Sequence, residues 1–291
     1  MITGLVLTIL TGIFWMAVGI IYSRVAGKRL NFTAFMLVYS LAYGIFVCAV
    51  RTPYLVPFQE ICKLAKIMLP ASLLGMAGFL ALYMAMKKSS HAVAWSFTQS
   101  AMIVPFLGGW LMLGSKVSCI NIAGAVLLLT ALCLFGRNKA GDSGENTALS
   151  GILWSIGSLL LTGLSQFLTL LPGMWFDGNS ELLSWRLPLQ VLPLIVVWLI
   201  ALAIRREKID LSAIKWGILY GVIVSIGQIL LYLALDRMQQ YQLSNAVYPT
   251  AIAMCIILFT VYCRIFRNER FTPLSIAGLL IMLCGMVTIL L

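Results

Sequence analysis

Long apolar stretches alternate with short polar connectors along the whole chain. Ten stretches of roughly 20 mostly apolar residues are present, and a helix of that length rises about 30 Å, the hydrocarbon thickness of a bilayer. Because lipid cannot satisfy an open strand edge, these stretches must be helical. The pattern therefore predicts an all-α integral membrane protein with ten transmembrane helices, at about 2–23, 32–50, 69–87, 91–113, 118–136, 149–171, 182–204, 213–235, 243–263 and 272–291.

The composition agrees with the apolar pattern. Hydrophobic residues make up 62% of the 291 residues, charged residues only 10%, and the mean hydropathy is +1.02. The net charge of +11 is divided among many connectors, which membrane orientation explains better than a nucleic-acid partner. The seven cysteines lie singly, so we expect neither a disulfide framework nor a metal site, and no cofactor.

The second half of the chain echoes the first. A polar, glycine-rich connector from Arg137 to Thr147 lies near the midpoint, and we take 1–140 and 141–291 as two repeats. Residues 78–85 match 227–234, and residues 116–124 match 270–278 at identical spacing. Because five spans per copy is an odd number, the copies must lie in opposite orientations. Inverted repeats of this kind build secondary transporters, with a substrate site near the middle of the membrane.

Three short motifs carry a family resemblance. They are Gly12-Ile13-Phe14-Trp15, Leu82-Tyr83-Met84-Ala85-Met86 running into Ser89-Ser90, and Glu269-Arg270-Phe271-Thr272 before the last span. The chain resembles the drug/metabolite transporter superfamily in its ten-helix form with two EamA-like halves. The resemblance implies a transporter with both ends in the cytoplasm. The chain departs from the family pattern at Ser115-Lys116, where the family usually has Glu-Arg, and in the spacing of Pro105 and Pro249 from this step.

The basic residues give an orientation that differs from the family's. With the N-terminus outside, 14 of the 20 basic residues face the cytoplasm and 6 face the other side. The positive-inside rule therefore predicts that both ends lie outside.

Enzyme signatures are scarce. The sequence has no Gly-rich phosphate loop, nucleophile elbow or paired carboxylates, and its single histidine, His91, is read as interfacial, with proton coupling as the alternative. All nine acids fall in connectors or at span ends. The small multidrug relatives carry an acid in their first helix, where this chain has Thr8, Thr11 and Trp15. Exchange of cationic drugs driven by an intramembrane carboxylate is therefore not expected.

Uncharged polar and aromatic residues inside the spans are the candidate substrate-binding residues. An unpaired amide in hydrocarbon is costly, so each amide must face protein or a cavity, and interhelical hydrogen bonding is the alternative to substrate contact. Aromatic walls with a few aimed polar groups are typical of ligand pockets, although packing and interfacial belts also use aromatics. Arg186 either extends to the interface or balances an anionic group on the substrate. The candidates are Trp15, Tyr39, Tyr43, Tyr83, Trp95, Gln99, Gln166, Arg186, Gln190, Gln228, Tyr232, Asn245 and Tyr248.

The sequence therefore predicts a secondary transporter that moves a small neutral or zwitterionic metabolite, such as an amino acid, nucleobase or vitamin, by alternating access. Efflux of organic cations or drugs held by aromatic residues is the alternative, and a membrane enzyme acting on lipid is disfavoured by the scattered acids. We expect a multi-pass protein of the bacterial inner membrane, monomeric or a weak homodimer, whose partners are the bilayer and a small-molecule substrate.

Overall fold

Helices fill almost all of the described chain. The computed structural model describes residues 1–27, 30–50, 54–113, 118–136, 145–176, 180–239 and 244–288, and these residues contain no strand. In chain order the elements are α1 (Ile2–Gly27), α2 (Phe32–Val50), α3 (Phe58–Lys88), α4 (His91–Gln99), the 3-10 turn η1 (Ser100–Met102), α5 (Ile103–Leu113), α6 (Cys119–Gly136), α7 (Glu145–Trp175), α8 (Ser180–Leu183), α9 (Arg186–Arg205), α10 (Leu211–Gln239), α11 (Ser244–Phe266) and α12 (Pro273–Thr288).

Six of the helical segments are long and apolar enough to cross a bilayer, counted within the described residues. They are Ile2–Gly27, Phe32–Val50, Phe58–Lys88, Leu149–Thr169, Glu181–Arg205 and Leu211–Leu231. Large apolar side chains cover their outer faces; Leu192 and Leu199 of α9, for example, are 56% and 55% exposed. Soluble monomers rarely expose large apolar side chains as one continuous surface. The prediction of an all-α, multi-pass membrane protein is confirmed.

Two of the predicted spans are interrupted. The fourth, expected at 91–113, is divided into α4 and α5 by the turn η1. Pro105 lies two residues into α5, and because proline has no N–H to donate, it accounts for the tightened turn just before it. The seventh, expected at 182–204, begins with the short helix α8 ahead of α9.

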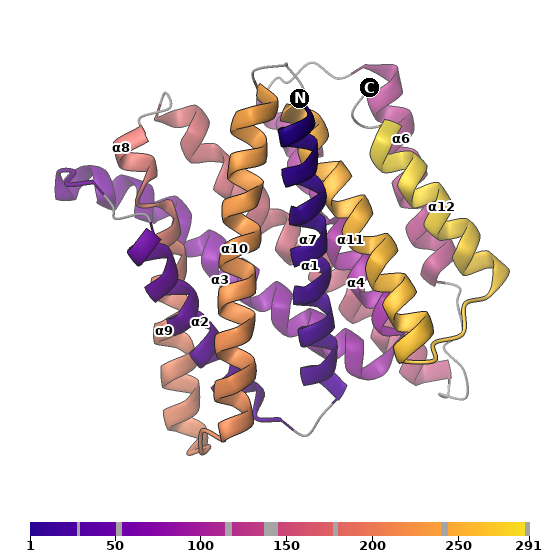
Figure 1. The fold of residues 1–291 in the computed structure, drawn as a ribbon, viewed down its shortest axis with the longest axis horizontal. Helices are drawn as coiled ribbons and strands as arrows, with labels where there is room; N and C mark the ends of the chain where they lie inside the picture. Colours follow the sequence, from indigo (N-terminus) through magenta and orange to yellow (C-terminus); the bar gives the residue numbers. More distant parts are fainter. Residues whose placement is uncertain are drawn as a thin grey trace.

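At one end of the molecule, four helix starts are each capped by the side chain of the residue that precedes the helix. Asn31 Oδ1 accepts from Ala34 N at 2.9 Å at the start of α2, and Asp210 Oδ1 accepts from Ala213 N at 2.7 Å at the start of α10. Ser90 caps α4 and Thr272 caps α12 in the same way. These side chains satisfy amides that a helix leaves unpaired in its first turn. The start of α1 and the end of α12 lie together at the opposite end (Figure 1).

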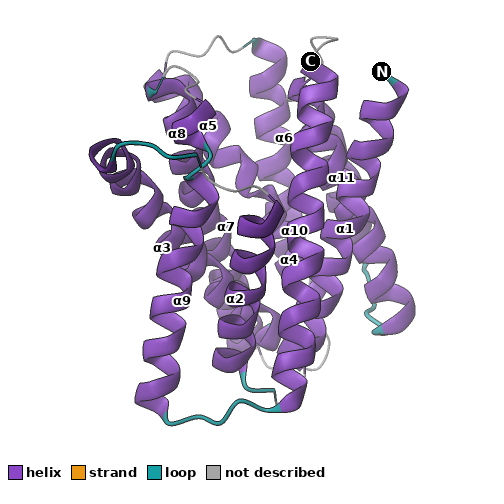
Figure 2. Cartoon of the chain, turned by 60° about the vertical axis from the view of Figure 1, so that its left-hand side comes forward, coloured by secondary structure: helices purple, strands orange, loops and turns teal. Residues whose placement is uncertain are grey.

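The helices pack in a bundle whose main contacts join the two parts of the chain. The most extensive pairs are α3 with α7, α6 with α12, α1 with α10, α2 with α10, α1 with α11 and α2 with α9. Figure 1 shows α6 and α12 at one side of the bundle, and their contacts with the remaining helices are few. Figure 2, coloured by secondary structure, shows that the described chain consists of helices joined by loops. The main bundle is therefore formed by α1 to α5 and α7 to α11.

Glycines bring several helix pairs into backbone contact. A Cβ added to Gly12 of α1 would lie 2.7 Å from the Ala251 carbonyl oxygen of α11. A Cβ added to Gly163 of α7 would lie 2.8 Å from the Ala101 carbonyl oxygen and 2.4 Å from Val104 Cγ2. Small residues allow this close approach, on which van der Waals packing between membrane helices depends.

Replacing Gly163 with alanine is expected to destabilise the protein, because the new methyl group overlaps a backbone oxygen that cannot move aside. The matched control is Gly157→Ala in the same helix, where the added Cβ meets nothing within 4 Å. Thermal unfolding in detergent should show a lower midpoint for Gly163→Ala only; 1 kcal/mol corresponds to about 2–4 °C for a chain of this size class. Equal midpoints for both variants would contradict the packing described.

Candidate functional site

Aromatic side chains pack together between α1, α2, α3 and α10, from the first residue of α2 inward. Tyr22 is fully buried and its hydroxyl donates to the Phe79 carbonyl oxygen at 2.5 Å. The ring centroids of Phe79, Phe32 and Tyr220 lie 5.9, 6.1 and 6.0 Å from that of Tyr22. Tilted and edge-on rings at these distances are the preferred arrangements of aromatic pairs. The sequence analysis did not single out Tyr22 or Tyr220.

Three of the predicted tyrosines belong to this aromatic group. Tyr39 and Tyr43 stack at 5.9 Å, and Tyr39 meets Tyr220 edge-on at 4.8 Å. Tyr83 stacks on Phe32 with 4.0 Å between the ring centroids. The ammonium group of Lys87 lies 4.4 Å from the centroid of the Tyr83 ring. The structure therefore brings Tyr39, Tyr43 and Tyr83 into one continuous cluster of rings.

Trp95 lies in a second aromatic group between α4, α11 and α1. Its indole Nε1 donates to Cys255 Sγ at 3.3 Å, and its ring lies 5.4 Å from that of Phe259. Gly19 provides the space beside both rings, since an added Cβ there would lie 2.9 Å from Trp95. With 2% exposure, Trp95 is a packed side chain in this conformation.

Two candidate residues, Trp15 and Gln166, occupy comparable places on α1 and α7. Trp15 follows Gly12 by three residues and also touches Gly227 of α10, so it lies between the faces of α1 that meet α11 and α10. Gln166 follows Gly163 by three residues and directly follows Ser165, whose hydroxyl donates to the Ala71 carbonyl of α3 at 2.7 Å. A rotation of about 100° per residue therefore places Gln166 between the faces of α7 that meet α3 and α5.

The remaining described candidates are spread over several helices. Gln99 is partly buried at the end of α4, directly before the turn η1. Gln228 is partly buried beside Gly227, and Gln190 uses its backbone carbonyl to accept from Ser72 Oγ at 2.5 Å. Arg186 is the first residue of α9 and partly buried. Tyr232, Asn245 and Tyr248 lie on α10 and α11, but their side chains fall outside the described part of the structure.

Two buried hydroxyls are further polar groups of the interior. The hydroxyls of Tyr220 and Thr162 have no hydrogen-bond partner among the described residues. An unsatisfied buried polar group costs about 1–3 kcal/mol, so each calls for an explanation such as a water or a ligand. The sequence analysis missed both, because tyrosine and threonine in an apolar span give no sign of whether they find a partner.

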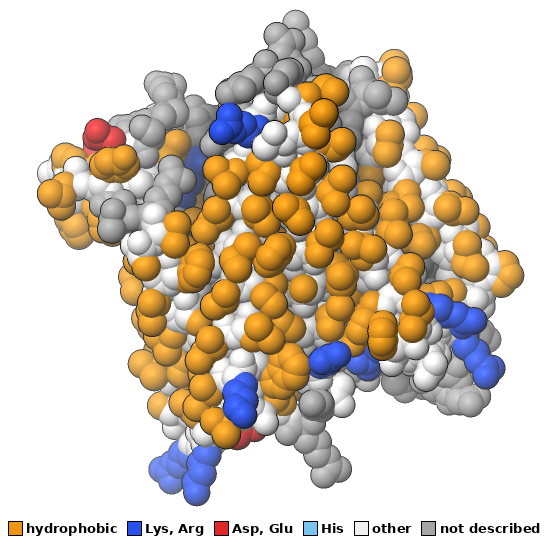
Figure 3. All heavy atoms as spheres, in the orientation of Figure 1, with side chains coloured by type: hydrophobic (Ala, Val, Ile, Leu, Met, Phe, Trp, Pro, Cys, Tyr) orange, Lys and Arg blue, Asp and Glu red, His pale blue; other side chains and the backbone are white. Residues whose placement is uncertain are grey.

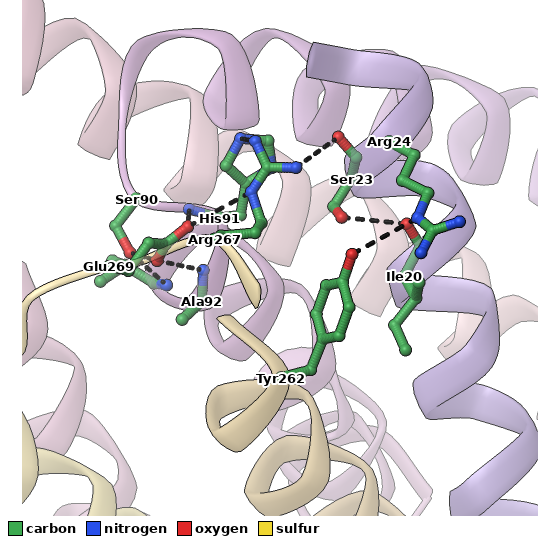
Figure 4. Close-up of polar contacts among 10 residues, drawn as sticks. Ile20, Ser23, Arg24, Ser90, His91, Ala92, Tyr262, Arg267 and Glu269 are labelled. Carbon is green, nitrogen blue, oxygen red and sulfur yellow. Dashed lines mark hydrogen bonds and ion pairs between the residues drawn. The ribbon is translucent and has the colours of Figure 1, made fainter. Parts of the chain in front are cut away.

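A carboxylate from the connection between α11 and α12 holds the start of α4. Glu269 Oε2 accepts from Ser90 Oγ at 2.5 Å and from Ala92 N at 3.3 Å, and Oε1 accepts from His91 N at 3.0 Å (Figure 4). A negative charge at a helix N-terminus is favoured by the helix dipole and by the free amides there. Although 178 residues separate Glu269 from His91, the two meet at one end of the molecule.

Arg267 extends this contact to α1. Its Nη2 lies 2.7 Å from His91 Nε2, its Nη1 donates to the Ser23 carbonyl at 3.3 Å, and its Nε lies 3.8 Å from Glu269 Oε1. Figure 4 shows these groups between α1, α4 and the α11–α12 connection. We call Ser23, Ser90, His91, Arg267 and Glu269 the latch. The sequence analysis read His91 as interfacial and quoted Glu269 only as part of a motif, so it did not predict this cluster.

The latch lies at the end of the molecule that carries most of the basic residues. This basic end contains the connections α1–α2, α3–α4, α9–α10 and α11–α12, with the described cations Arg24, Lys87, Lys88, Arg205, Arg206, Lys208, Lys215, Arg264, Arg267 and Arg270. On the face in Figure 3, apolar side chains cover the middle and most of the blue side chains gather along the lower margin. The described basic residues at the other end are Lys63, Lys66, Arg186 and Arg237.

Described residues line a cavity at the basic end and a groove on the outer surface. One, of about 330 Å³, opens at the basic end between α2, α3 and α9, and Tyr83 is its only wall residue from the predicted set. The other, of about 360 Å³, is an apolar groove on the outer side of α2 and α9, and Gly44 and Val191 are among its lining residues. In this conformation the described core consists of packed hydrophobic clusters, of which the aromatic groups are a part.

Comparisons with known proteins support the fold alone. No protein-family model matches the chain, and no curated protein matches it. Among solved structures, 28 chains match. One of them, described only as "Crystal structure of protein", has 12% sequence identity and a TM-score of 0.58, over 97% of this chain and 95% of the other. This likeness extends over nearly the full length of both chains.

Removal of the Glu269 carboxylate is expected to destabilise the protein. Hydrogen bonds to a charged group are worth about 1.5–3 kcal/mol each, and Glu269→Ala loses three acceptor contacts at once. Glu60→Ala is the control, because among the described residues Glu60 pairs with the exposed Lys63 in the same helix. We expect a fall of several degrees in the unfolding midpoint for Glu269→Ala and little change for Glu60→Ala. If both variants unfold at the wild-type temperature, the latch contributes nothing to this conformation.

Proposed function

We propose that this protein is a secondary transporter built from two inverted five-helix halves, residues 1–140 and 141–291, that moves a small neutral or zwitterionic metabolite by alternating access. The first half contains α1 to α6 and the second α7 to α12, with α4 and α5 together forming one crossing. The boundary between residues 140 and 141 lies outside the described residues. The proposal has ten crossings, which include the interrupted and shorter helices.

The observation that carries the proposal is a crossed pattern of helix contacts. In an exchange of the halves, α1 corresponds to α7, α2 to α9, α3 to α10, and α4 with α5 to α11. The α3–α7 contact then corresponds to α10–α1, and the α2–α10 contact to α9–α3. The α1–α11 contact corresponds to that of α7 with α4 and α5, and all of these contacts occur. The pairs α6–α12, α2–α9 and α4–α11 are exchanged into themselves. Within the described residues, the α1–α3 contact lacks an equally extensive counterpart between α7 and α10. The pattern supports a twofold relation between the halves.

Two close contacts follow the same exchange in detail. Gly12 of α1 meets the Ala251 carbonyl and Met254 of α11, whereas Gly163 of α7 meets the Ala101 carbonyl and Val104 of the η1–α5 region. In each case a glycine meets a carbonyl oxygen and the side chain three residues later. Trp15 and Gln166, each three residues after its glycine, then occupy equivalent positions toward the interior. Substrate sites at such repeat interfaces are common in secondary transporters.

The chemistry of the interior favours a neutral or zwitterionic substrate. The described acids lie in connectors or at helix ends; they are Glu60, Glu181, Glu207, Asp210 and Glu269. No described carboxylate is therefore placed in the interior to pair with an organic cation. Amides such as Gln166, Gln99 and Gln228, together with the unpaired hydroxyls of Tyr220 and Thr162, supply donors and acceptors instead. Organic cations held by the aromatic clusters are the alternative substrate class, which the same assays distinguish.

The latch supports the alternating-access part of the proposal. Ser23, Ser90 and His91 belong to the first half, and Arg267 and Glu269 to the second, so the latch joins the halves at the basic end. Opening of that end requires these contacts to break. The charge distribution makes the basic end cytoplasmic, with both termini outside, and the conformation described is then closed toward the cytoplasm.

A metabolite screen tests the proposed substrate class. A library of amino acids, nucleobases and vitamins, with a panel of organic cations beside it, is added to the purified protein during thermal unfolding. A ligand at 100 times its Kd stabilises the folded state by about 2.7 kcal/mol. We expect a stabilising neutral or zwitterionic compound whose effect, and whose uptake into proteoliposomes, is reduced at least about tenfold by Gln166→Ala. Gln59→Ala, at the exposed start of α3, is the control.

Stabilisation and uptake confined to the organic cations would replace the proposed substrate class with the alternative. Stabilisation by a metabolite with unchanged uptake in Gln166→Ala would contradict the placement of the site at the interior positions.

Breaking the latch is expected to expose the basic end. Cys263 of α11 is fully buried beneath the latch, and its backbone carbonyl accepts from Arg267 N and Glu269 N. In a variant that keeps Cys263 as the only cysteine, Glu269→Gln should accelerate labelling by a membrane-impermeant thiol reagent applied from the basic side. Glu60→Gln should leave the rate unchanged. Equal labelling rates in both variants would exclude the latch as a gate.

A further inference from the structure

The cavity at the basic end combines an apolar wall with two cations from different helices. Phe32, Leu80 and Met84 form the apolar part of its lining, and Lys87 of α3 and Arg205 of α9 supply the positive charges. Glu207 supplies a negative charge, so the lining has a net charge of one positive unit. The lining belongs to the ends of three helices, and the cavity therefore lies where the apolar surface of the bundle meets the basic end.

Neither cation is fully engaged by the protein. Lys87 Nζ lies 4.4 Å from the centroid of the Tyr83 ring and forms no ion pair with a described carboxylate. Arg205 Nη1 is 3.8 Å from Glu207 Oε1 and 3.5 Å from Thr33 Oγ1, both near the limit of such contacts, and its side chain is 64% exposed. Both groups thus have N–H donors left for an anion.

We propose that this cavity binds a phosphate group and that an anionic phospholipid supplies it. The phosphate lies between Lys87 and Arg205, and the glycerol and upper acyl chain pack on Phe32, Leu80 and Met84. A guanidinium and an ammonium bind phosphate through strong charge-assisted hydrogen bonds. Basic pockets between transmembrane helices on the cytoplasmic side are suited to anionic headgroups.

The apolar part of the lining favours a lipid over a soluble phosphate. An inorganic phosphate would leave Phe32, Leu80 and Met84 uncovered, whereas a phospholipid buries apolar surface and pairs the cations in one molecule. The walls come from α2 and α3 on one side and α9 on the other, so an occupied cavity ties the ends of three helices together. Tyr83 lines this cavity, but Trp15, Gln166 and Gln228, at the interior positions proposed for the transported substrate, do not.

Native mass spectrometry and thermal unfolding of the purified full chain test this site without any transport substrate. The probes are dioleoylphosphatidylglycerol, dioleoylphosphatidylcholine and inorganic phosphate. We expect phosphatidylglycerol to be retained and to raise the unfolding midpoint, and phosphatidylcholine and inorganic phosphate to have smaller effects. Lys87→Gln with Arg205→Gln should weaken phosphatidylglycerol binding at least about tenfold, the factor that 1.4 kcal/mol represents.

Two further double variants separate the site from general electrostatics and from misfolding. Lys215→Gln with Arg270→Gln removes the same charge from exposed positions at the basic end and should retain the lipid. Lys87→Arg with Arg205→Lys keeps both charges and should restore most of the binding. Equal loss in the two glutamine variants would overturn the proposal. An effect of inorganic phosphate as large as that of phosphatidylglycerol would overturn the assignment to a lipid.

Discussion

The inability of hydrocarbon to hydrogen-bond is the constraint on which this structure depends. Every backbone N–H and C=O within the bilayer must find a partner in the protein, which leaves helices as the solution seen here. Where a helix begins or ends, other groups supply hydrogen-bond partners for the backbone amides and carbonyls that the helix leaves unpaired. Asn31, Ser90, Asp210 and Thr272 cap helix starts, and Arg206 and Asn268 adopt positive φ just beyond the ends of α9 and α11. The interruption at Ser100–Met102 occurs deep within the bundle, beside α7, and not toward lipid.

Since lipid tails are as apolar as the side chains, burial of apolar surface cannot by itself select which helices pair. Close packing and a few polar contacts make that selection. Gly12 and Gly163 bring α1 onto α11 and α7 onto the region of Ala101, and Ser165 bonds the Ala71 carbonyl of α3. Most of these pairings join the first part of the chain to the second. The contacts that give the bundle its shape are therefore mostly contacts between segments far apart in the sequence.

Charged and uncharged polar groups lie at different depths in the bundle. Charged groups meet at the basic end, where water can reach them: Glu269 and Arg267 join three elements there, and Lys87 and Arg205 face a shared cavity. Apart from Arg186 at the start of α9, whose guanidinium is partly buried, the described polar groups deeper in the bundle are uncharged. Several buried hydroxyls pair with backbone carbonyls, and those of Tyr220 and Thr162 are unpaired among the described residues. Charged groups thus join helix ends where water is near, while uncharged polar groups lie deeper, where a charge would be costly.

The sequence alone determined that the chain is helical and lies in a membrane. The length and hydropathy of a span are local properties of the sequence, and they decide whether a helix is stable in lipid. The second predicted span agrees with α2 in both bounds, whereas the third, predicted to begin at residue 69, begins at Phe58, so part of a predicted connector is helical. It could not determine that Glu269 meets Ser90, that Tyr22 lies against Phe79, or that Lys87 and Arg205 share a cavity. The sequence of an apolar helix does not indicate which helices it packs against. Those contacts therefore depend on how glycine-lined faces pack in three dimensions, which only the tertiary structure decides.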